Sequence, residues 1–151
     1  MLSYQVETFD QVVPDIHELI KLHYDEIALH KEAIPLDPDW DRYKNLENLD
    51  MLFIATVRDE GKLVGYSVFF ITRHMHYNST LMASNDILYL HPDYRHGMSG
   101  IKLIKFSESE LKKFNVTKVL WHIKFQKDFR KILYRMGYVD EDAIVGKILK
   151  D

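Results

Sequence analysis

The chain has 151 residues and a net charge of −3, contains no cysteine, and is 46% hydrophobic. This length suits one folding unit with a real core, so we expect a single domain over residues 1–151. The lack of cysteine excludes disulfides, cysteine nucleophiles and thiolate metal sites, and the negative charge gives no general attraction to nucleic acid or to an anionic membrane.

Neither a leader nor a membrane span is expected. Residues Met1 to Phe9 lack a basic region followed by an apolar run, and the longest apolar stretches, such as Leu63 to Ile71, are too short to cross a bilayer. A chain without cysteine also fits a reducing compartment. We therefore expect a cytoplasmic protein.

The first third of the chain predicts a strand and two helices. Alternation over Tyr4 to Thr8 predicts a short strand, and a helical period of apolar residues follows from Val12 to Ile27. The run Pro35 to Asp39 ends that helix, and a second, shorter helix is expected over Trp40 to Leu49.

The remainder predicts a hairpin, a strand–helix–strand unit, a short helix ended by Gly137, and a last strand. The expected ranges are Met51 to Val57, Leu63 to Ile71, Thr80 to Leu90, a helix from Ser99, Val116 to Ile123, Asp128 to Met136, and Tyr138 to Leu149. The order β-α-α-β-β-β-α-β-α-β corresponds to a mixed α/β sandwich. Its middle strands should pair antiparallel, and the unit from Ile87 to Ile123 should make a parallel, right-handed crossover.

The stretch from Leu88 to Ile104 carries the clearest functional pattern. A strand ends, a tight loop with Gly97 and Gly100 follows, and an amphipathic helix begins. Glycines let backbone N–H groups approach an anion closely, and a helix start adds unpaired donors and a positive dipole end. With Arg95 and two lysines nearby, this would make a pyrophosphate cradle. Taken alone, a plain strand-to-helix turn with glycines for packing explains the pattern equally well.

The same stretch resembles the R/Q-x-x-G-x-G/A turn of the GNAT superfamily of N-acetyltransferases. Arg95 and Gly100 match the two ends of that frame, and His91-Pro92-Asp93-Tyr94-Arg95 is similar to the family's V-x-P-x-Y-R approach. Leu133 to Tyr138 resembles its Y-x-x-x-G-F ending. The resemblance covers nearly the whole chain and implies a single-domain GNAT-like mixed sheet with helices on both faces.

Two details refine the resemblance. Met98 stands where the family usually has its middle glycine, while Gly97 lies one position earlier. Shorter runs are similar to a subgroup frequently encoded by tailed bacteriophages, which would place the protein in the host cytoplasm. These runs are His23-Tyr24-Asp25-Glu26, Pro38-Asp39-Trp40, His74-Met75-His76-Tyr77, Asn85-Asp86 and Trp121-His122.

The resemblance implies that acetyl-CoA, or CoA, binds where the fourth and fifth strands splay apart. The backbone of the fourth strand would bond the pantetheine like an added strand, the loop amides would hold the pyrophosphate, and a residue opening the last helix would touch the cofactor's arm. The implied cofactor residues are Leu88, Tyr89, Leu90, Arg95, His96, Gly97, Met98, Ser99, Gly100 and Gln126.

Asp86 is the preferred catalytic base. Acetylation of an amine needs a base, a donor for the oxyanion, and an acid for the leaving thiolate. Asp86 lies nine residues before Arg95, and the family often places its base on this strand. A carboxylate in a largely apolar strand must have a partner or a function, so a turn cap or a pair with Arg73 or a histidine stays open as the alternative.

Three further side chains are catalytic candidates. His76 shares a face with His74, and it would shape the amine site or deprotonate the amine. The alternative is that it simply lies at an exposed strand end. Metal binding is not expected, because the two histidines have no third ligand nearby. The resemblance implies a tyrosine acid in the last helix. Tyr134 precedes Gly137 by three residues instead of the usual four. A shift of one residue turns a side chain by about 100° around the helix axis. His122 would relay a proton, or it would only pack against its neighbours near the point where the strands splay apart.

The segment from Ile27 to Tyr43 should form one wall of the acceptor site, as in the family. Its acidic residues would favour a cationic acceptor: a polyamine, an aminoglycoside, or a lysine or N-terminal amine of a protein. They are Glu32, Asp37, Asp39 and Asp41, and a solvated helix cap explains each of them individually.

The sequence therefore predicts an N-acetyltransferase that moves acetyl from acetyl-CoA to a primary amine by direct transfer. The alternative is a non-catalytic CoA-binding or protein-interaction module, such as a phage factor acting on a host protein. Neither nucleic acid nor a membrane is expected as a partner. In such folds the last strand and the exposed apolar edge often pair with a second copy, which implies a homodimer.

Overall fold

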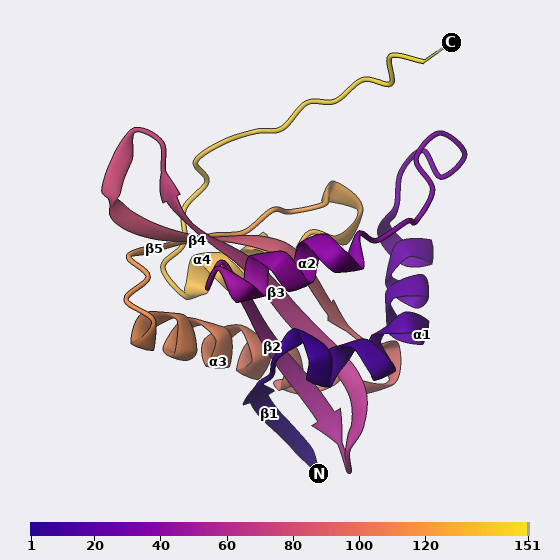
Figure 1. The fold of residues 1–151 in the computed structure, drawn as a ribbon. Helices are drawn as coiled ribbons and strands as arrows, with labels where there is room; N and C mark the ends of the chain where they lie inside the picture. Colours follow the sequence, from indigo (N-terminus) through magenta and orange to yellow (C-terminus); the bar gives the residue numbers. More distant parts are fainter. Residues whose placement is uncertain (151) are drawn as a thin grey trace.

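The computed structural model describes residues 1–150, which build one mixed sheet with helices on both faces (Figure 1). The strands are β1 (Leu2–Val6), β2 (Leu52–Asp59), β3 (Lys62–His74), β4 (Tyr77–Leu90) and β5 (Lys118–Leu120). The α-helices are α1 (Phe9–Ile27), α2 (Trp40–Asn48), α3 (Ser99–Lys113) and α4 (Arg130–Arg135), and the 3-10 turns are η1 (Pro92–Tyr94) and η2 (Phe125–Lys127). The predicted mixed α/β architecture is confirmed.

The sheet has the order β1-β2-β3-β4-β5. Neighbours from β1 to β4 pair antiparallel, and β5 pairs with β4 in parallel, as a crossover through α3 requires. That last pairing is short, because only Met82 to Ser84 face Lys118 to Leu120. The half of β4 that follows therefore has no strand beside it on the β5 side among the described residues.

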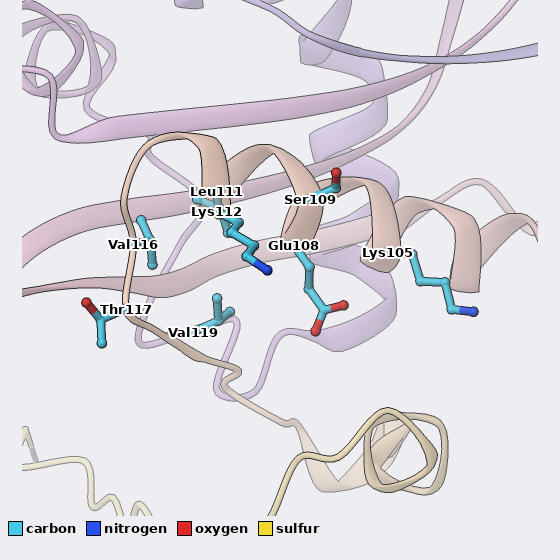
Figure 2. A pocket seen from close by; sticks show the side chains of 8 residues that line it. All are labelled: Lys105, Glu108, Ser109, Leu111, Lys112, Val116, Thr117 and Val119. Atoms are coloured by element: carbon cyan, nitrogen blue, oxygen red, sulfur yellow. The ribbon is translucent and has the colours of Figure 1, made fainter.

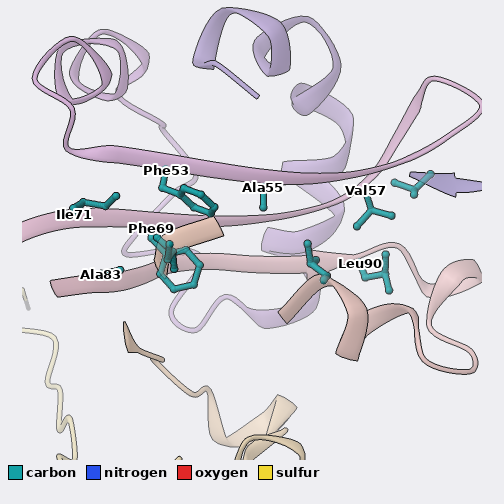
Figure 3. Packing of buried hydrophobic residues seen from close by; sticks show 10 residues of the cluster. Phe53, Ala55, Val57, Phe69, Ile71, Ala83 and Leu90 are labelled. Carbon is teal, nitrogen blue, oxygen red and sulfur yellow. The ribbon is translucent and has the colours of Figure 1, made fainter. Parts of the chain in front are cut away.

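Two hydrophobic clusters hold the layers together. On one face, α1 contributes Phe9, Val12 and Ile16 to a cluster with the sheet residues Tyr66 and Tyr89. Local signals start this helix, since Thr8 and Gln11 form a reciprocal capping box. On the other face, residues of α3 and the central strands make the second cluster (Figure 3). The helices on both faces thus bury opposite sides of the same strands, as alternation along each strand requires.

The predicted last strand, Tyr138 to Leu149, is wrong as an element of this structure. After α4 the chain makes no strand pairing through residue 150. Side chains of residues 138–141 still contact α3, α4 and β5, and the chain then leaves the body of the protein (Figure 1). The predicted fifth strand is also shorter than expected, three residues in place of Val116 to Ile123. Both regions have strand-like composition, but a strand forms only where a neighbour accepts its hydrogen bonds.

One buried ion pair joins β2 to the segment after β1 and to α1. Arg58 is 9% exposed, and its guanidinium contacts Glu7, Asp15 and the carbonyl of Gly61. Glu7 has a lowered pKa despite its burial, because Arg58 and Thr56 donate hydrogen bonds to it. The network joins β1, α1 and the β2–β3 turn, so we assign it to folding.

Removing Arg58 should therefore destabilise the protein strongly. In Arg58→Met the carboxylate of Glu7 stays buried without a partner, which should lower the free energy of unfolding by about 3–5 kcal/mol. Lys44→Met is the matched control, because Lys44 pairs with the exposed Asp10 and should contribute under about 1 kcal/mol. Urea unfolding measures both, and equal losses would contradict this assignment.

Among residues 1–150, no helix is both long and apolar enough to cross a bilayer.

Candidate active site

The strands β4 and β5 diverge after Ser84, and this divergence creates a free backbone edge on β4. The edge runs through Leu88, Tyr89 and Leu90, which are paired with β3 on their other side. An extended ligand could add to it as a further strand would. The residues that the sequence predicts for the pantetheine arm therefore lie where a strand-like ligand can bind.

The edge leads directly into a loop and the start of α3. After η1 the chain passes through Gly97, whose φ of 61° lies in the left-handed region that glycine adopts at little cost. No side chain caps the first turn of α3. Its first N–H groups therefore remain available to an external acceptor, and the helix dipole favours a negative charge there.

Gly100 shows that this helix start has room for a ligand. A Cβ added at Gly100 would meet no atom within 4 Å, so the space beside the first turn of α3 is open. Two side chains fix the loop around it. The hydroxyl of Tyr4 donates to the carbonyl of Ser99, and that of Tyr94 donates to Asp59. A held loop with free donors and open space fits the diphosphate of a coenzyme.

Arg95, expected as a free positive charge near that anion, is engaged with Glu26 at the end of α1. Its guanidinium donates to both carboxylate oxygens of Glu26 at 2.6 Å, and its Nε donates to the carbonyl of Leu90 at 2.6 Å. The guanidinium also lies over the ring of Tyr89. Hydrogen bonds from Arg95 and Lys127 lower the pKa of Glu26 to about 2, so the carboxylate is charged at neutral pH. Arg95 thus anchors the loop more than it offers a free cation.

The turn η2 is tied to the same end of α1. Lys127 Nζ lies 3.1 Å from Glu26, and the amide of Gln126 donates to the carbonyl of Ile27 at 2.9 Å. Gln126, predicted to touch the cofactor's arm, therefore contacts α1 in this structure. The connection after β5 and the loop before α3 are consequently both held by the last turn of α1.

Asp86 occupies a β-bulge in β4. Val68 pairs with Ile87 and Phe69 pairs with Asn85, so Asp86 is the extra residue without a partner on β3. A bulge bends the strand and redirects a side chain. The amide of Asn85 stabilises it by donating to the carbonyls of Val68 and Ile87.

The carboxylate of Asp86 receives a hydrogen bond from Tyr43 of α2, with 2.5 Å between Tyr43 Oη and Asp86 Oδ2. Burial raises the pKa of Asp86, while the Tyr43 hydrogen bond and the nearby His122 lower it. Burial also raises the pKa of Tyr43, so the phenol stays protonated and donates. Among the described residues, the hydrogen-bond partner of the Asp86 side chain is therefore Tyr43, in place of the expected turn, Arg73 or histidine.

An aromatic wall surrounds this pair. Phe9 stacks on Tyr43 with ring centroids 6.3 Å apart, and Phe70 lies 6.1 Å from Tyr43 on the sheet side. Trp40 completes the wall and contacts the ring of His17 edge-on. The spacing of Trp40 and Tyr43 is the sequence feature that could have predicted this wall, because residues three apart share a helix face.

Beneath the free edge of β4 lies a buried histidine. His23 Nδ1 lies 2.9 Å from the hydroxyl of Tyr66, and its ring stacks on Tyr89 at 4.8 Å. Burial lowers the pKa of His23 to about 4, so the ring is neutral at physiological pH. We therefore assign His23 to packing beneath β4.

The other catalytic candidates are spread apart. His76 lies at the tip of the β3–β4 hairpin, where its backbone donates to His74 Nδ1. The ten residues from Tyr77 to Asp86 separate it from Asp86 by about 30 Å of strand. The hydroxyl of Tyr134 lies 2.8 Å from both carboxylate oxygens of Asp140. The tyrosine that the resemblance implies as the acid is therefore hydrogen-bonded to the segment after α4.

The proposed acceptor wall is an exposed loop between α1 and α2. Tyr24 pins it by donating to the carbonyl of Ile34. Asp39 accepts from the backbone N–H of Arg42 and caps α2, which accounts for that residue structurally. Glu32, Asp37 and Asp41 are exposed. Within residues 1–150, no group of three or more His, Asp or Glu side chains is arranged to hold a metal ion.

Comparison with known proteins agrees with this fold. The model of the acetyltransferase (GNAT) family matches residues 14–138. No curated protein matches the chain. Among solved structures, a ribosomal-protein-alanine N-acetyltransferase from Brucella melitensis biovar Abortus 2308 is similar with a TM-score of 0.71 and 16% identity, each chain being covered over 100%.

Two further solved structures show the same fold. An aminoglycoside acetyltransferase from an uncultured soil metagenomic sample, in complex with sisomicin, has a TM-score of 0.73 and 16% identity over 99% of this chain and 97% of that one. A predicted acetyltransferase with acetyl-CoA from Clostridium acetobutylicum has a TM-score of 0.74 and 15% identity over 99% and 97%. At these identities the likeness establishes the fold.

Proposed function

Because the chain belongs to the GNAT acetyltransferase family, we propose that it transfers an acetyl group from acetyl-CoA directly to a primary amine. The observation that carries the proposal is the free edge of β4, which runs from the carboxylate of Asp86 to the uncapped start of α3. A thioester carrier with a diphosphate needs a binding edge and an anion site, and the reacting amine needs a base.

The residues present fit acetyl-CoA. The edge at Leu88 to Leu90 would hold the pantetheine, the N–H groups from His96 to Gly100 would hold the diphosphate, and the open space at Gly100 admits it. When bound, acetyl-CoA supplies the activated acetyl group. Lys102 and Lys105, exposed on α3, add positive charge near the phosphates.

Asp86 then serves as the base, directly or through water. It takes one proton from the protonated amine, and the neutral nitrogen then forms its bond to the acetyl carbon as the carbon–sulfur bond breaks. The second proton that the nitrogen loses goes to water. The raised pKa of Asp86 makes it a better proton acceptor than an exposed carboxylate. The thiolate takes a proton from water, or from Tyr134 if that hydroxyl leaves Asp140. His76 would become the next candidate base if Asp86 fails.

The acceptor is proposed to be a cationic amine. It would enter between the α1–α2 loop and the aromatic wall of Phe9, Trp40, Tyr43 and Phe70, and Asp86 would be the charged group that it meets there. Aromatic faces and carboxylates both favour ammonium groups. Polyamines, aminoglycosides, and lysine or N-terminal amines of proteins are the classes to test. Release of CoA from acetyl-CoA, measured for each class, tests the proposal, and a folded protein that binds CoA without turnover on any class would favour the non-catalytic alternative.

The contact between Tyr43 and Asp86 should be visible in the pH dependence. The Tyr43 hydrogen bond lowers the pKa of Asp86, so Tyr43→Phe should raise that pKa further. A base works when deprotonated, so the acidic limb of the kcat/KM profile should move to higher pH in this variant. Tyr77→Phe, at the exposed hairpin tip, is the matched control. An acidic limb that stays in place in Tyr43→Phe would show that Asp86 does not set it.

A further inference from the structure

The last turn of α1 carries a carboxylate that is held by two cations from different segments. Arg95 donates to both oxygens of Glu26 at 2.6 Å, and Lys127 Nζ lies 3.1 Å from one of them. Arg95 follows β4, whereas Lys127 lies in η2 and follows β5. These are the two strands that diverge after Ser84. One anion of the chain therefore joins two cations that follow the diverging strands.

This cluster is accessible to solvent, unlike the buried pair of Arg58 and Glu7. The side chains of Arg95 and Lys127 are 36% and 53% exposed, and that of Glu26 is 18% exposed. Those of Arg58 and Glu7 are only 10% and 9% exposed. Accessible ion pairs add little to folding stability, because water screens them. Stability therefore does not account for the Glu26 cluster, and a ligand can reach its cations.

The guanidinium of Arg95 is also fixed by contacts that do not involve Glu26. Its Nε donates to the carbonyl of Leu90 at 2.6 Å, and the group lies 5.1 Å from the centroid of the Tyr89 ring. The two terminal nitrogens that donate to Glu26 form a planar fork, and such a fork binds a carboxylate or a phosphate in the same bidentate way. Another anion can thus replace the carboxylate while the guanidinium stays in place.

The position of this fork suits a phosphate of the coenzyme. Arg95 joins the end of the free edge of β4, at Leu90, to the loop that leads through Gly97 to α3. A coenzyme whose pantetheine lies along the edge and whose diphosphate lies at the start of α3 would pass this junction. Its diphosphate carries a charge on each phosphate, so it competes with a single carboxylate for the two cations.

Another part of the surface with two lysines lacks this arrangement. A groove of about 490 Å³ between α3 and β5 is lined by Lys105 and Lys112 together with the apolar Leu111, Val116 and Val119 (Figure 2). Neither lysine is paired with a carboxylate among the described residues, and no arginine is part of the lining. The groove therefore lacks the fixed donors that a bidentate anion site requires.

We propose that Arg95 and Lys127 form a phosphate site, and that Glu26 is an internal anion which the diphosphate of the coenzyme displaces when it binds. Glu26 thereby weakens coenzyme binding, and it acts on the charge of the site and not on the acetyl transfer. The inference rests on the proposed function, from which it takes its ligand, and it adds roles for Glu26 and Lys127.

Isothermal titration calorimetry with acetyl-CoA on the full chain tests the displacement. Glu26→Gln removes the charge but keeps an oxygen that accepts from Arg95, so it should bind acetyl-CoA at least about fivefold more tightly than the wild type. Asp25→Asn is the matched control, because it removes the same charge one residue away, from a side chain that pairs with Lys31. Equal or weaker binding by Glu26→Gln, or an equal gain in both variants, would overturn the proposal.

Lys127→Gln tests the second cation independently. The phosphate loses a partner in this variant, so acetyl-CoA should bind at least about fivefold more weakly. If Lys127 served only to hold Glu26, its removal would leave the affinity unchanged or raise it. Lys124→Gln is the control, because Lys124 is exposed beside the same turn and should bind acetyl-CoA as the wild type does. Unchanged or tighter binding by Lys127→Gln would contradict its place in the site.

The wild type separates failure of this inference from failure of the proposed function. If the wild type binds acetyl-CoA but the Glu26 and Lys127 variants do not change the affinity in opposite directions, the displacement is wrong and the acetyltransferase assignment is untouched. A folded wild type that binds no acetyl-CoA would contradict both.

Discussion

Asp86→Asn is expected to lower turnover by about 10²–10⁴-fold, the range typical of general acid–base catalysis, while acetyl-CoA affinity stays nearly unchanged. The substitution keeps the size of the side chain, and its amide oxygen can still accept the hydrogen bond from Tyr43. Only the basicity is lost. The rate deficit should shrink at high pH, where more of the amine is already neutral. Steady-state kinetics and calorimetry with acetyl-CoA measure the two quantities separately.

Two comparisons make that result specific. Ser84→Ala changes another half-buried residue of β4 that shares the face of Asp86, and it should have a much smaller effect. Tyr134→Phe should also cost less than Asp86→Asn, because Asp140 holds the hydroxyl of Tyr134. If Asp86→Asn turns over like the wild type on the true acceptor, Asp86 is not the base.

Gly100→Glu should abolish measurable binding of acetyl-CoA and of CoA. The added side chain would enter the open space beside the first turn of α3, and its charge would face the phosphates. Two like charges about 4 Å apart at an effective dielectric of 20 repel by about 4 kcal/mol, which corresponds to a loss of affinity well beyond a hundredfold. Isothermal titration calorimetry on both ligands measures the loss.

The fold should tolerate this change, which makes the experiment easy to interpret. No atom lies near the new Cβ, and a glutamate in the first turn of a helix is favoured by the dipole. Gly100→Gln matches the size without the charge and should bind more tightly than Gly100→Glu, and Gly100→Ala should bind nearly as the wild type. Unchanged affinity in a folded Gly100→Glu protein would mean that the phosphates lie elsewhere.

The order of elements could be read from the sequence because its signals are local. Apolar alternation and helical periodicity depend on neighbouring residues, as do the capping box at Thr8 and the left-handed Gly137 with φ of 92°. The last strand could not be decided this way. Its composition is that of a strand, but pairing depends on a neighbour that the sequence does not name.

The candidate site was predictable in part for the same reason. The loop before α3 and the position of Asp86 on β4 follow from short patterns. The contacts of Asp86 with Tyr43 and of Arg95 with Glu26 join residues 43 and 69 positions apart, and a single sequence carries no record of such pairs. The β-bulge at Asp86 could not be predicted either, because a bulge depends on how two strands pair and not on one strand alone. The resemblance to a phage-encoded subgroup stays a prediction.

The most direct test of the acetyltransferase assignment is mass spectrometry of proteins and metabolites from cells that express the wild type, compared with cells that express Asp86→Asn at the same level. We expect added acetyl groups on a defined set of amines with the wild type, and their strong reduction with Asp86→Asn. If the folded wild type adds no acetyl group to any amine beyond the level in cells lacking the protein, the proposed transfer is contradicted.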